Sequence, residues 1–319
     1  MRRKAITAAV IVGALALTGC AGQATSSSPE GGASFPTKKI TVVLGFAAGS
    51  PTDVTGRILS SCVEEELGQP VVVENREGAS SALATSQVAR SKPDGYTLTL
   101  GGTSSFVLVP HFNPDAGYDL NDLGTVASTK VSPEIVMVPK DSPYKSLGDL
   151  LKSTTPVIVA VAGEQSGSGI IASNWIKQGH KIQTVVQPAV GEVKRGLDTG
   201  DYDAAIGYLG TDTMKWLTDG ELVGLGLQSD KRVELLPKVP TFEEAGHSEG
   251  QLPAPSNLVT WAGPAGMPDE VVSVLSGAFE KCVAKPEIVE RLGTVGITFI
   301  DAQESTRRLK ALETAVAGL

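Results

Sequence analysis

Three short segments of this 319-residue chain combine glycine with serine or threonine, and they are the strongest candidates for chemistry: residues 46–53, 101–105 and 163–168. Glycine lets the backbone come close to a bound group, and the hydroxyls of serine and threonine are neutral hydrogen-bond donors. Backbone N–H groups at helix starts bind anions without any net positive charge. The segments therefore predict a site for a small anion such as a carboxylate.

The same residue types also serve ordinary turns and helix ends. Asp53 and Ser168, for example, belong to types that cap helices. One such segment is weak evidence for a site, whereas three at equivalent strand ends favour ligand binding. Glu164, an acidic residue within the third segment, either repels a carboxylate, binds an amino group or points to solvent.

Patterns typical of catalysis or metal binding are sparse. The histidines, His111, His180 and His247, are widely separated in the sequence, and there is no Cys-x-x-Cys pair. Neither the P-loop nor the dinucleotide-binding glycine pattern occurs with its proper spacing. We therefore expect no enzymatic activity, no metal site and no cofactor.

One stretch, residues 246–250, matches the Gly-x-Ser-x-Gly pattern of serine hydrolases. A catalytic serine in that pattern must lie between a strand and a helix. Here a predicted helical segment, residues 242–245, precedes the match, and Pro253 and Pro255 follow it. We interpret it as a loop; an extracellular hydrolase that uses Ser248 is the alternative.

Short β-branched runs alternate with amphipathic segments, which is typical of α/β proteins with parallel strands. The predicted strands are residues 40–46, 71–74, 96–100, 157–162, 182–186, 204–208, 222–227, 258–262 and 297–300. The predicted helices are residues 53–67, 80–90, one through Trp175 and Ile176, 190–197, 268–284 and a final amphipathic helix. Ligands of open α/β sheets bind at the carboxyl ends of strands, where the three candidate segments lie.

The alternation of predicted strands and helices starts near residue 40 and again near residue 157. Two such units fit a two-lobed binding protein whose first lobe is completed by the C-terminal segment. The predicted lobe I comprises residues 35–135 plus 258–319, and lobe II comprises residues 136–257. We expect the ligand cleft to lie between them.

The N-terminus indicates export. Three basic residues, at positions 2–4, precede an apolar or small-residue stretch, residues 5–19, that ends at Cys20. This is typical of a signal peptide, and the stretch is shorter than the roughly 20 residues that span a bilayer. Residues 17–20 resemble a bacterial lipobox, so we expect residues 1–19 to be removed and Cys20 to be acylated. Residues 20–34, rich in glycine and serine, are the predicted flexible tether.

The formal charge of −8 becomes −11 when the three basic residues at positions 2–4 are removed, which argues against nucleic acid as a partner. Outside the cytoplasm, Cys62 and Cys282 can form a disulfide. The alternative is that both remain buried thiols, because both fall at apolar positions of helical patterns.

Seven stretches in order along the chain resemble the substrate-binding receptors of tripartite tricarboxylate transporters, also called Bug receptors. They are residues 35–36, 46–53, 67–76, 92–98, 146–150, 231–246 (in its matching parts) and 263–268. The resemblance implies a two-lobed, periplasmic-binding-protein-like fold (a type II solute-binding protein) that closes on its ligand. It also implies a small carboxylate ligand and delivery to integral membrane permease subunits.

The resemblance places the carboxylate between the loop of residues 48–53 in the first lobe and that of residues 163–168 in the second. Residues 103–105 match the next first-lobe loop, and Gly207 and Tyr208 fall where the family has a further contact. The complete set of predicted ligand-binding residues is Phe46, Ala48, Gly49, Ser50, Thr52, Asp53, Thr103, Ser104, Ser105, Gly163, Glu164, Ser166, Gly167, Ser168, Gly191, Gly207 and Tyr208.

Three departures from the family prevent the transfer of a ligand identity. Gly49 is followed by Ser50 and Pro51 where the family commonly has Gly-Gly. Residues 186–191 lack the aromatic and cationic residues of the family's Val-Pro-Tyr-Lys-Gly stretch. The Asp frequent at the position of Gly207 is also absent.

The expected location is the outer face of the bacterial cell membrane, on its periplasmic or cell-surface side, with acylated Cys20 in the lipid bilayer. The leading hypothesis is a transport receptor. The alternative is a receptor of the same fold that presents its ligand to a membrane sensor.

Overall fold

The computed structural model describes residues 35–252, 258–293 and 296–317. The predicted signal peptide, Cys20 and the tether lie outside the described residues, as do Pro253 and Pro255. Residues Phe35–Leu319 form one compact unit, which contains two sheets. In the part of the chain that the structure describes, no helix is both long and apolar enough to cross a membrane.

The first sheet gathers strands from both ends of this unit, in the order β11-β4-β10-β3-β1-β2. Its strands are β1 (Ile40–Leu44), β2 (Val71–Asn75), β3 (Thr97–Gly101), β4 (Leu123–Val131), β10 (Leu258–Pro264) and β11 (Ile297–Asp301). The first three are mutually parallel, whereas β10 runs antiparallel to β3 and β4. The carboxyl ends of β1 and β3 therefore lie at one edge of the sheet, and the loops that follow them can meet.

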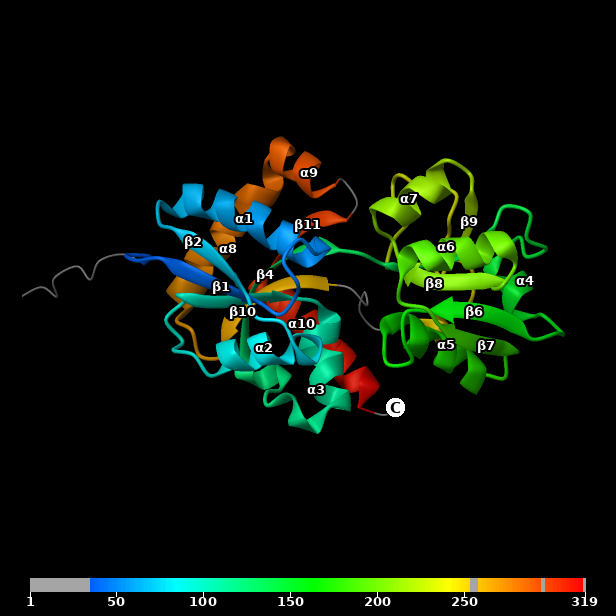
Figure 1. Cartoon of the computed structure of the whole chain (residues 1–319), viewed down its shortest axis with the longest axis horizontal. Helices are drawn as coiled ribbons and strands as arrows, with labels where there is room; N and C mark the ends of the chain where they lie inside the picture. Colours follow the sequence, from blue (N-terminus) through cyan, green and yellow to red (C-terminus); the bar gives the residue numbers. More distant parts are fainter. Residues whose placement is uncertain (1–34, 253–257, 294–295, 318–319) are drawn as a thin grey trace, which may run out of the picture. The chain divides into compact units, whose positions relative to one another are not determined.

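Helices cover both faces of this sheet (Figure 1). One face carries α1 (Pro51–Leu67), α8 (Asp269–Ala284) and α9 (Pro286–Leu292), and the other carries α2 (Ala82–Ala89), α3 (Val109–Phe112) and α10 (Ala302–Val316). Buried residues such as Leu59 on α1 and Phe279 on α8 belong to one hydrophobic core with Val42 of β1. Burial of this kind supplies most of the stability of amphipathic helices.

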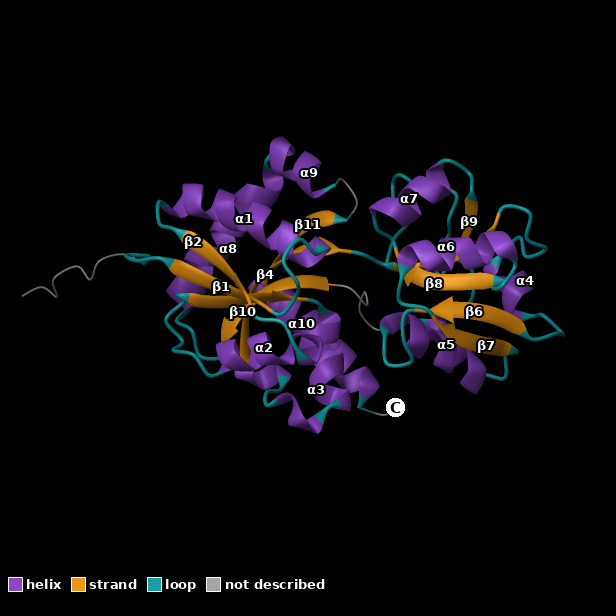
Figure 2. Ribbon diagram, viewed as in Figure 1, coloured by secondary structure: helices purple, strands orange, loops and turns teal. Residues whose placement is uncertain are grey.

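The second sheet has the order β7-β6-β8-β5-β9 (Figure 2). Its strands are β5 (Glu134–Pro139), β6 (Val157–Val161), β7 (Ile182–Val186), β8 (Ala204–Tyr208) and β9 (Leu222–Gln228). Its helices are α4 (Leu147–Leu151), α5 (Gly167–Lys177), α6 (Val190–Thr199) and α7 (Thr211–Thr218). Strand β6 is parallel to β7 and β8, so the loops after β6, β7 and β8 also share one edge.

Helix α1 shows why the sequence folds as it does near the first candidate segment. The Ser50 hydroxyl caps the helix by accepting a hydrogen bond from the Asp53 N–H, and Pro51 occupies the first turn. The helix ends at Gly68, whose φ of 64° is left-handed and therefore favours glycine.

Two sequence predictions about helices are wrong. The helix predicted from residue 80 begins at Ala82, because residues 79–81 have positive φ and form a separate 3₁₀ turn. Residues 242–245 form turns rather than a helix. Thr241 and Glu244 do exchange capping hydrogen bonds there, but Gly246, with φ of 75°, ends the turn at once.

A disulfide joins α1 to α8, between Cys62 and Cys282. Both cysteines are buried in the core shared by these helices and the first sheet. The structure thus contains the bridge, one of the two alternatives that the sequence left open.

Candidate ligand-binding site

A cavity of about 830 Å³ is lined by loops that follow strands of both sheets. Its lining includes Phe46, Thr52, Ser81, Ser105 and Lys130 from the first sheet's side, and Ser166, Val190, Tyr208, Thr211 and Thr213 from the second's. The volume lies in the range that holds small-molecule ligands. Two candidate segments of the sequence, residues 46–53 and 101–105, contribute to this cavity, and the third contributes Ser166.

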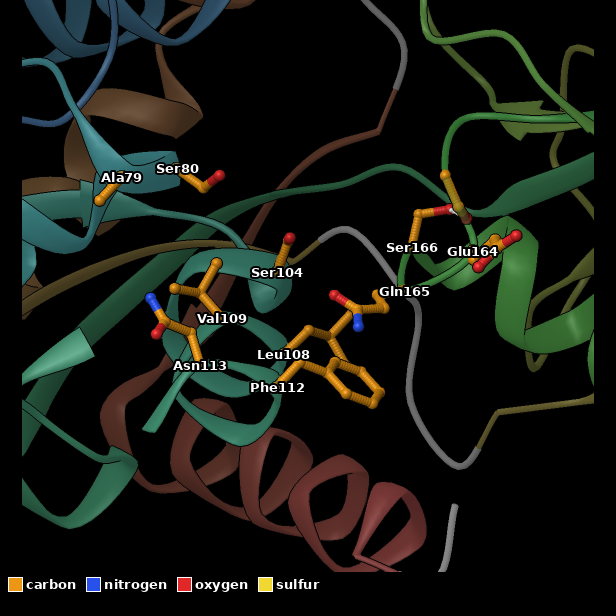
Figure 3. A pocket seen from close by; sticks show the side chains of 11 residues that line it. Ala79, Ser80, Ser104, Leu108, Val109, Phe112, Asn113, Glu164, Gln165 and Ser166 are labelled. Atoms are coloured by element: carbon orange, nitrogen blue, oxygen red, sulfur yellow. Dashed lines mark hydrogen bonds between the residues drawn. The ribbon is translucent and has the colours of Figure 1, made fainter. Parts of the chain in front are cut away.

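A second cavity, of about 570 Å³, shares Ser80, Ser104 and Ser166 with the first. Figure 3 shows Leu108 and Phe112 on the first sheet's side of this cavity, with Gln165 and Ser166 across from them. Because the two cavities have residues in common, they adjoin one another.

Four helices begin at the larger cavity. The first turn of α1 contributes Pro51 and Thr52, the N-cap of α5 contributes Ser166, and the starts of α6 and α7 contribute Val190 and Thr211. A helix N-terminus carries unpaired N–H groups and the positive end of the helix dipole. The cavity therefore favours an anionic ligand group.

Asp53 holds the first loop in shape. Its carboxylate accepts hydrogen bonds from the Gly49 N–H (2.9 Å), the Asn75 side-chain amide (2.7 Å) and Arg57 Nε (3.0 Å). The same Asn75 amide donates to the carbonyl of Phe46, which lines the cavity. The Arg57 hydrogen bond, opposed by burial and supported by Asn75 and Gly49, lowers the pKa of Asp53 to about 2. Asp53 thus holds the loop in shape from a position outside both cavity linings.

Two serines hold the loop before α5. The Ser166 hydroxyl caps the helix by accepting from the Gly169 N–H (3.2 Å), and it lies 2.6 Å from the Gly163 carbonyl. The Ala162 N–H donates to the Ser168 hydroxyl at 3.0 Å. Gly169 is required here, because a Cβ at this position would lie 2.1 Å from the Gly163 carbonyl oxygen.

A strained turn lines both cavities. Ala79, Ser80 and Ser81 are consecutive non-glycine residues with φ of 47°, 54° and 79°. Backbone of this kind costs on the order of 1–3 kcal/mol per residue and is concentrated at functional sites. Ser81 is also buried, and it packs so closely on Gly45 that a Cβ there would lie 2.5 Å from its Cα. Sequence patterns did not identify this turn as part of the site.

Lys130 is the cation of the larger cavity, and sequence reasoning missed it. It lies on β4, one residue before the end of the strand, and is half-buried. Burial lowers the pKa of its ammonium group, and the structure pairs it with no carboxylate among the described residues. A partly desolvated charge without a counter-ion is unfavourable, so the site is suited to an anion supplied from outside.

Tyr208 faces the same cavity from the end of β8. Burial, together with the charge of the nearby Glu134, raises the pKa of its phenol. The hydroxyl therefore remains protonated and able to donate a hydrogen bond at neutral pH.

The predicted binding residues fall into two groups. Those that line a cavity are Phe46, Thr52, Ser104, Ser105, Gly163, Glu164, Ser166 and Tyr208. Within the described chain, those outside the two cavity linings are Ala48, Gly49, Ser50, Asp53, Thr103, Gly167, Ser168, Gly191 and Gly207. Several of the latter shape the lining: Asp53 and Ser168 hold the loops, and Thr103 accepts a hydrogen bond from the Leu258 N–H.

The hydrolase-like pattern does not occupy a strand–turn–helix. Ser248 begins a three-residue 3₁₀ turn that follows other turns. Two histidines that are far apart in the sequence do meet here, because His247 Nδ1 and His180 Nε2 lie 3.0 Å and 3.7 Å from one Glu249 oxygen. Over residues 35–252, 258–293 and 296–317, no cluster of His, Cys, Asp or Glu has the arrangement of a metal site.

Residues 55–314 match the model of the tripartite tricarboxylate transporter family receptor. A Pseudomonas sp. (strain P51) protein, named as the UPF0065 protein in the tcbD-tcbE intergenic region, is 30% identical over 272 residues, which is 82% of this chain and 79% of that protein.

Solved structures agree with the fold. A TctC solute-binding protein from Polaromonas has a TM-score of 0.77 at 22% identity, covering 90% of this chain and 100% of that one. MatC from Rhodopseudomonas palustris, with bound malate, has a TM-score of 0.64 at 26% identity, and the match covers 89% of this chain and 97% of MatC. These likenesses confirm the predicted solute-binding-protein fold.

Proposed function

Because the chain belongs to the tripartite tricarboxylate transporter receptor family, we propose that it captures a small carboxylate in the larger cavity and delivers it to a membrane permease. The observation that carries the ligand class is the convergence of four helix N-termini and Lys130 on one cavity. Malate bound to MatC, a relative of similar fold, supports the same class.

The carboxylate is held mainly by neutral donors. The Ser105 hydroxyl, backbone N–H groups at the helix starts and the neutral Tyr208 phenol surround the space that Lys130 faces. Neutral donors bind a carboxylate through charge-assisted hydrogen bonds, each about twice as strong as a neutral pair. Lys130 adds the one full positive charge of this lining.

The two sheets support a two-lobed mechanism, with lobe I as residues 35–135 plus 258–319 and lobe II as residues 136–257. Both sheets contribute loops to the cavity, so a ligand touches residues of both lobes. Contacts made to both lobes at once stabilise the closed arrangement relative to the open one and shift the population toward it.

A thermal-shift screen of the purified protein against mono-, di- and tricarboxylates, aromatic acids and amino acids tests the ligand class. A ligand at 100 times its Kd raises the free energy of unfolding by about 2.7 kcal/mol. We expect at least one carboxylic acid to raise Tm and its amide or alcohol analogue not to. A folded protein that responds to no acid would refute the proposal.

We also propose that the chain is exported and anchored to the outer face of the cell membrane through acylated Cys20. The support is the sequence of residues 2–20, with its basic start, apolar stretch and lipobox-like end. Labelling of cells with radioactive palmitate should mark the protein. A Cys20→Ser variant that keeps the label would count against the anchor.

A further inference from the structure

The smaller cavity indicates what the rest of the ligand looks like. Resting on the proposed function, we propose that the ligand is a monocarboxylate with an apolar body, whose carboxylate lies near Lys130 and whose body extends along Leu108, Val109 and Phe112. The inference separates this chain from receptors for compact acids with several carboxylates.

The charges of the two cavities differ. The larger one contains Lys130, together with the exposed carboxylates of Glu77 and Asp212. The smaller one has no lysine or arginine among its lining residues, and its single charged side chain is the exposed Glu164. A second carboxylate on the ligand would therefore leave water without gaining a cationic partner, which is unfavourable.

The apolar residues of the smaller cavity come from one stretch of chain. Leu108 is buried, and Val109 and Phe112 are half-buried, packing against the core on their inner sides. Their remaining exposed surface lines the cavity, and Figure 3 shows Leu108 and Phe112 beside the space that Gln165 faces from the other side. A ligand that covers this surface removes apolar area from water, which favours binding.

The shared residues fix how the ligand spans the two spaces. Ser80, Ser104 and Ser166 line both cavities, so they stand at the junction. A chain attached to a carboxylate near Lys130 passes these hydroxyls before it reaches Phe112. The strained turn at residues 79–81 is thereby placed where the ligand changes from polar to apolar surroundings.

A matched ligand triad tests this arrangement: hexanoate, adipate and 6-aminohexanoate share one six-carbon chain and differ only at the far end. Isothermal titration calorimetry with the purified protein should give hexanoate the lowest Kd, at least about tenfold below that of adipate, which corresponds to about 1.4 kcal/mol. The longer triad of octanoate, suberate and 8-aminooctanoate should show the same order.

Two variants make the test specific. Phe112→Ala should weaken hexanoate binding about tenfold and acetate binding far less, because acetate has no body to reach the apolar surface. Phe112→Leu should restore most of the loss. Gln165→Lys, at an exposed position, should narrow or reverse the preference over adipate by supplying the missing cation.

The outcomes separate the two proposals. Tighter binding of adipate, or of malate or citrate, than of hexanoate would overturn the apolar-body inference and leave the receptor function standing. Tightest binding of 6-aminohexanoate would overturn it in favour of an amine partner at the far end. If no acid of any kind binds the folded protein, the receptor function itself fails.

Discussion

Lys130→Met removes the ammonium group of the larger cavity and keeps a side chain of similar length. A hydrogen bond to a charged group is worth about 1.5–3 kcal/mol, so the Kd for a carboxylate ligand should rise roughly 10- to 150-fold. The free energy of unfolding, by contrast, should stay the same or rise. Burial already opposes the charge of Lys130 in the ligand-free protein, so the variant should unfold at the same denaturant concentration as the wild type or at a higher one.

The assay pairs calorimetric titration with urea unfolding, using a carboxylate found in the thermal-shift screen. Lys238→Met is the matched control, because Lys238 is exposed and lines neither of the two cavities. Unchanged affinity in a folded Lys130→Met protein would refute the assignment. A large loss of stability would instead mean that Lys130 has a structural role.

The pH dependence of binding has a definite sign. In the proposed site, Lys130 binds the carboxylate in its charged form, which is present below the pKa of its ammonium group and lost above it. Because burial lowers this pKa from its ordinary 10.5, wild-type affinity should begin to fall at a lower pH than for an exposed lysine. Titrations of Lys130→Met across the same alkaline range should lack this decline.

Three further predictions concern the framework of the site. Asp53→Asn should lower the free energy of unfolding by about 1.5–3 kcal/mol at pH 7. Because the folded pKa of Asp53 is depressed to about 2, the wild-type advantage is complete above its ordinary value of 3.8 and lost as pH falls toward 2, so urea curves of the two proteins should converge there. Gly169→Ala should displace the loop before α5 and cost about 1–3 kcal/mol, together with ligand affinity, whereas Gly277→Ala in open space on α8 should not weaken binding. Replacing both Cys62 and Cys282 by alanine opens a link between residues 220 apart and should cost about 2–5 kcal/mol in urea unfolding, and an unchanged midpoint would contradict a stabilising role.

The elements that sequence predicts well are those whose signals are local. Helix α1 has a capping serine and a proline at its start, an apolar period along its length and glycine at its end, and its observed start lies two residues before the predicted one. Strand β7 (Ile182–Val186) and strand β8 (Ala204–Tyr208) have the predicted bounds, because each is a short uncharged run between turn residues.

Strands β4 and β5 were not assigned from the sequence, although they carry the chain from one sheet to the other. Strand β4 pairs with β10 and β11, whose residues lie more than 120 positions further along the chain. Its sequence, LGTVASTKV, mixes glycine and hydroxyl residues with few large apolar ones. Its pairing depends on distant partners, so no local pattern specifies it.

The site was only half visible in the sequence for the same reason. Glycine and hydroxyl loops at strand ends have a recognisable composition, and they supplied Thr52, Ser105 and Ser166. The strained turn at residues 79–81 also follows a glycine and contains two serines, but these serines were assigned to a helix predicted from residue 80, and nothing in the local sequence indicates three consecutive positive φ angles. Lys130 had one usable sign: it is the single charged residue between residues 123 and 133.

The balance of one partly buried lysine against many neutral donors suits a protein that must both bind and release its ligand. A lysine that loses hydration contributes less net affinity than its Coulomb attraction suggests, because desolvation offsets part of the gain. The neutral hydroxyls and helix N-termini that line the cavity come from loops of both sheets. We infer that separation of these loops removes several modest interactions at once, so that the carboxylate leaves without any single strong ion pair having to be broken.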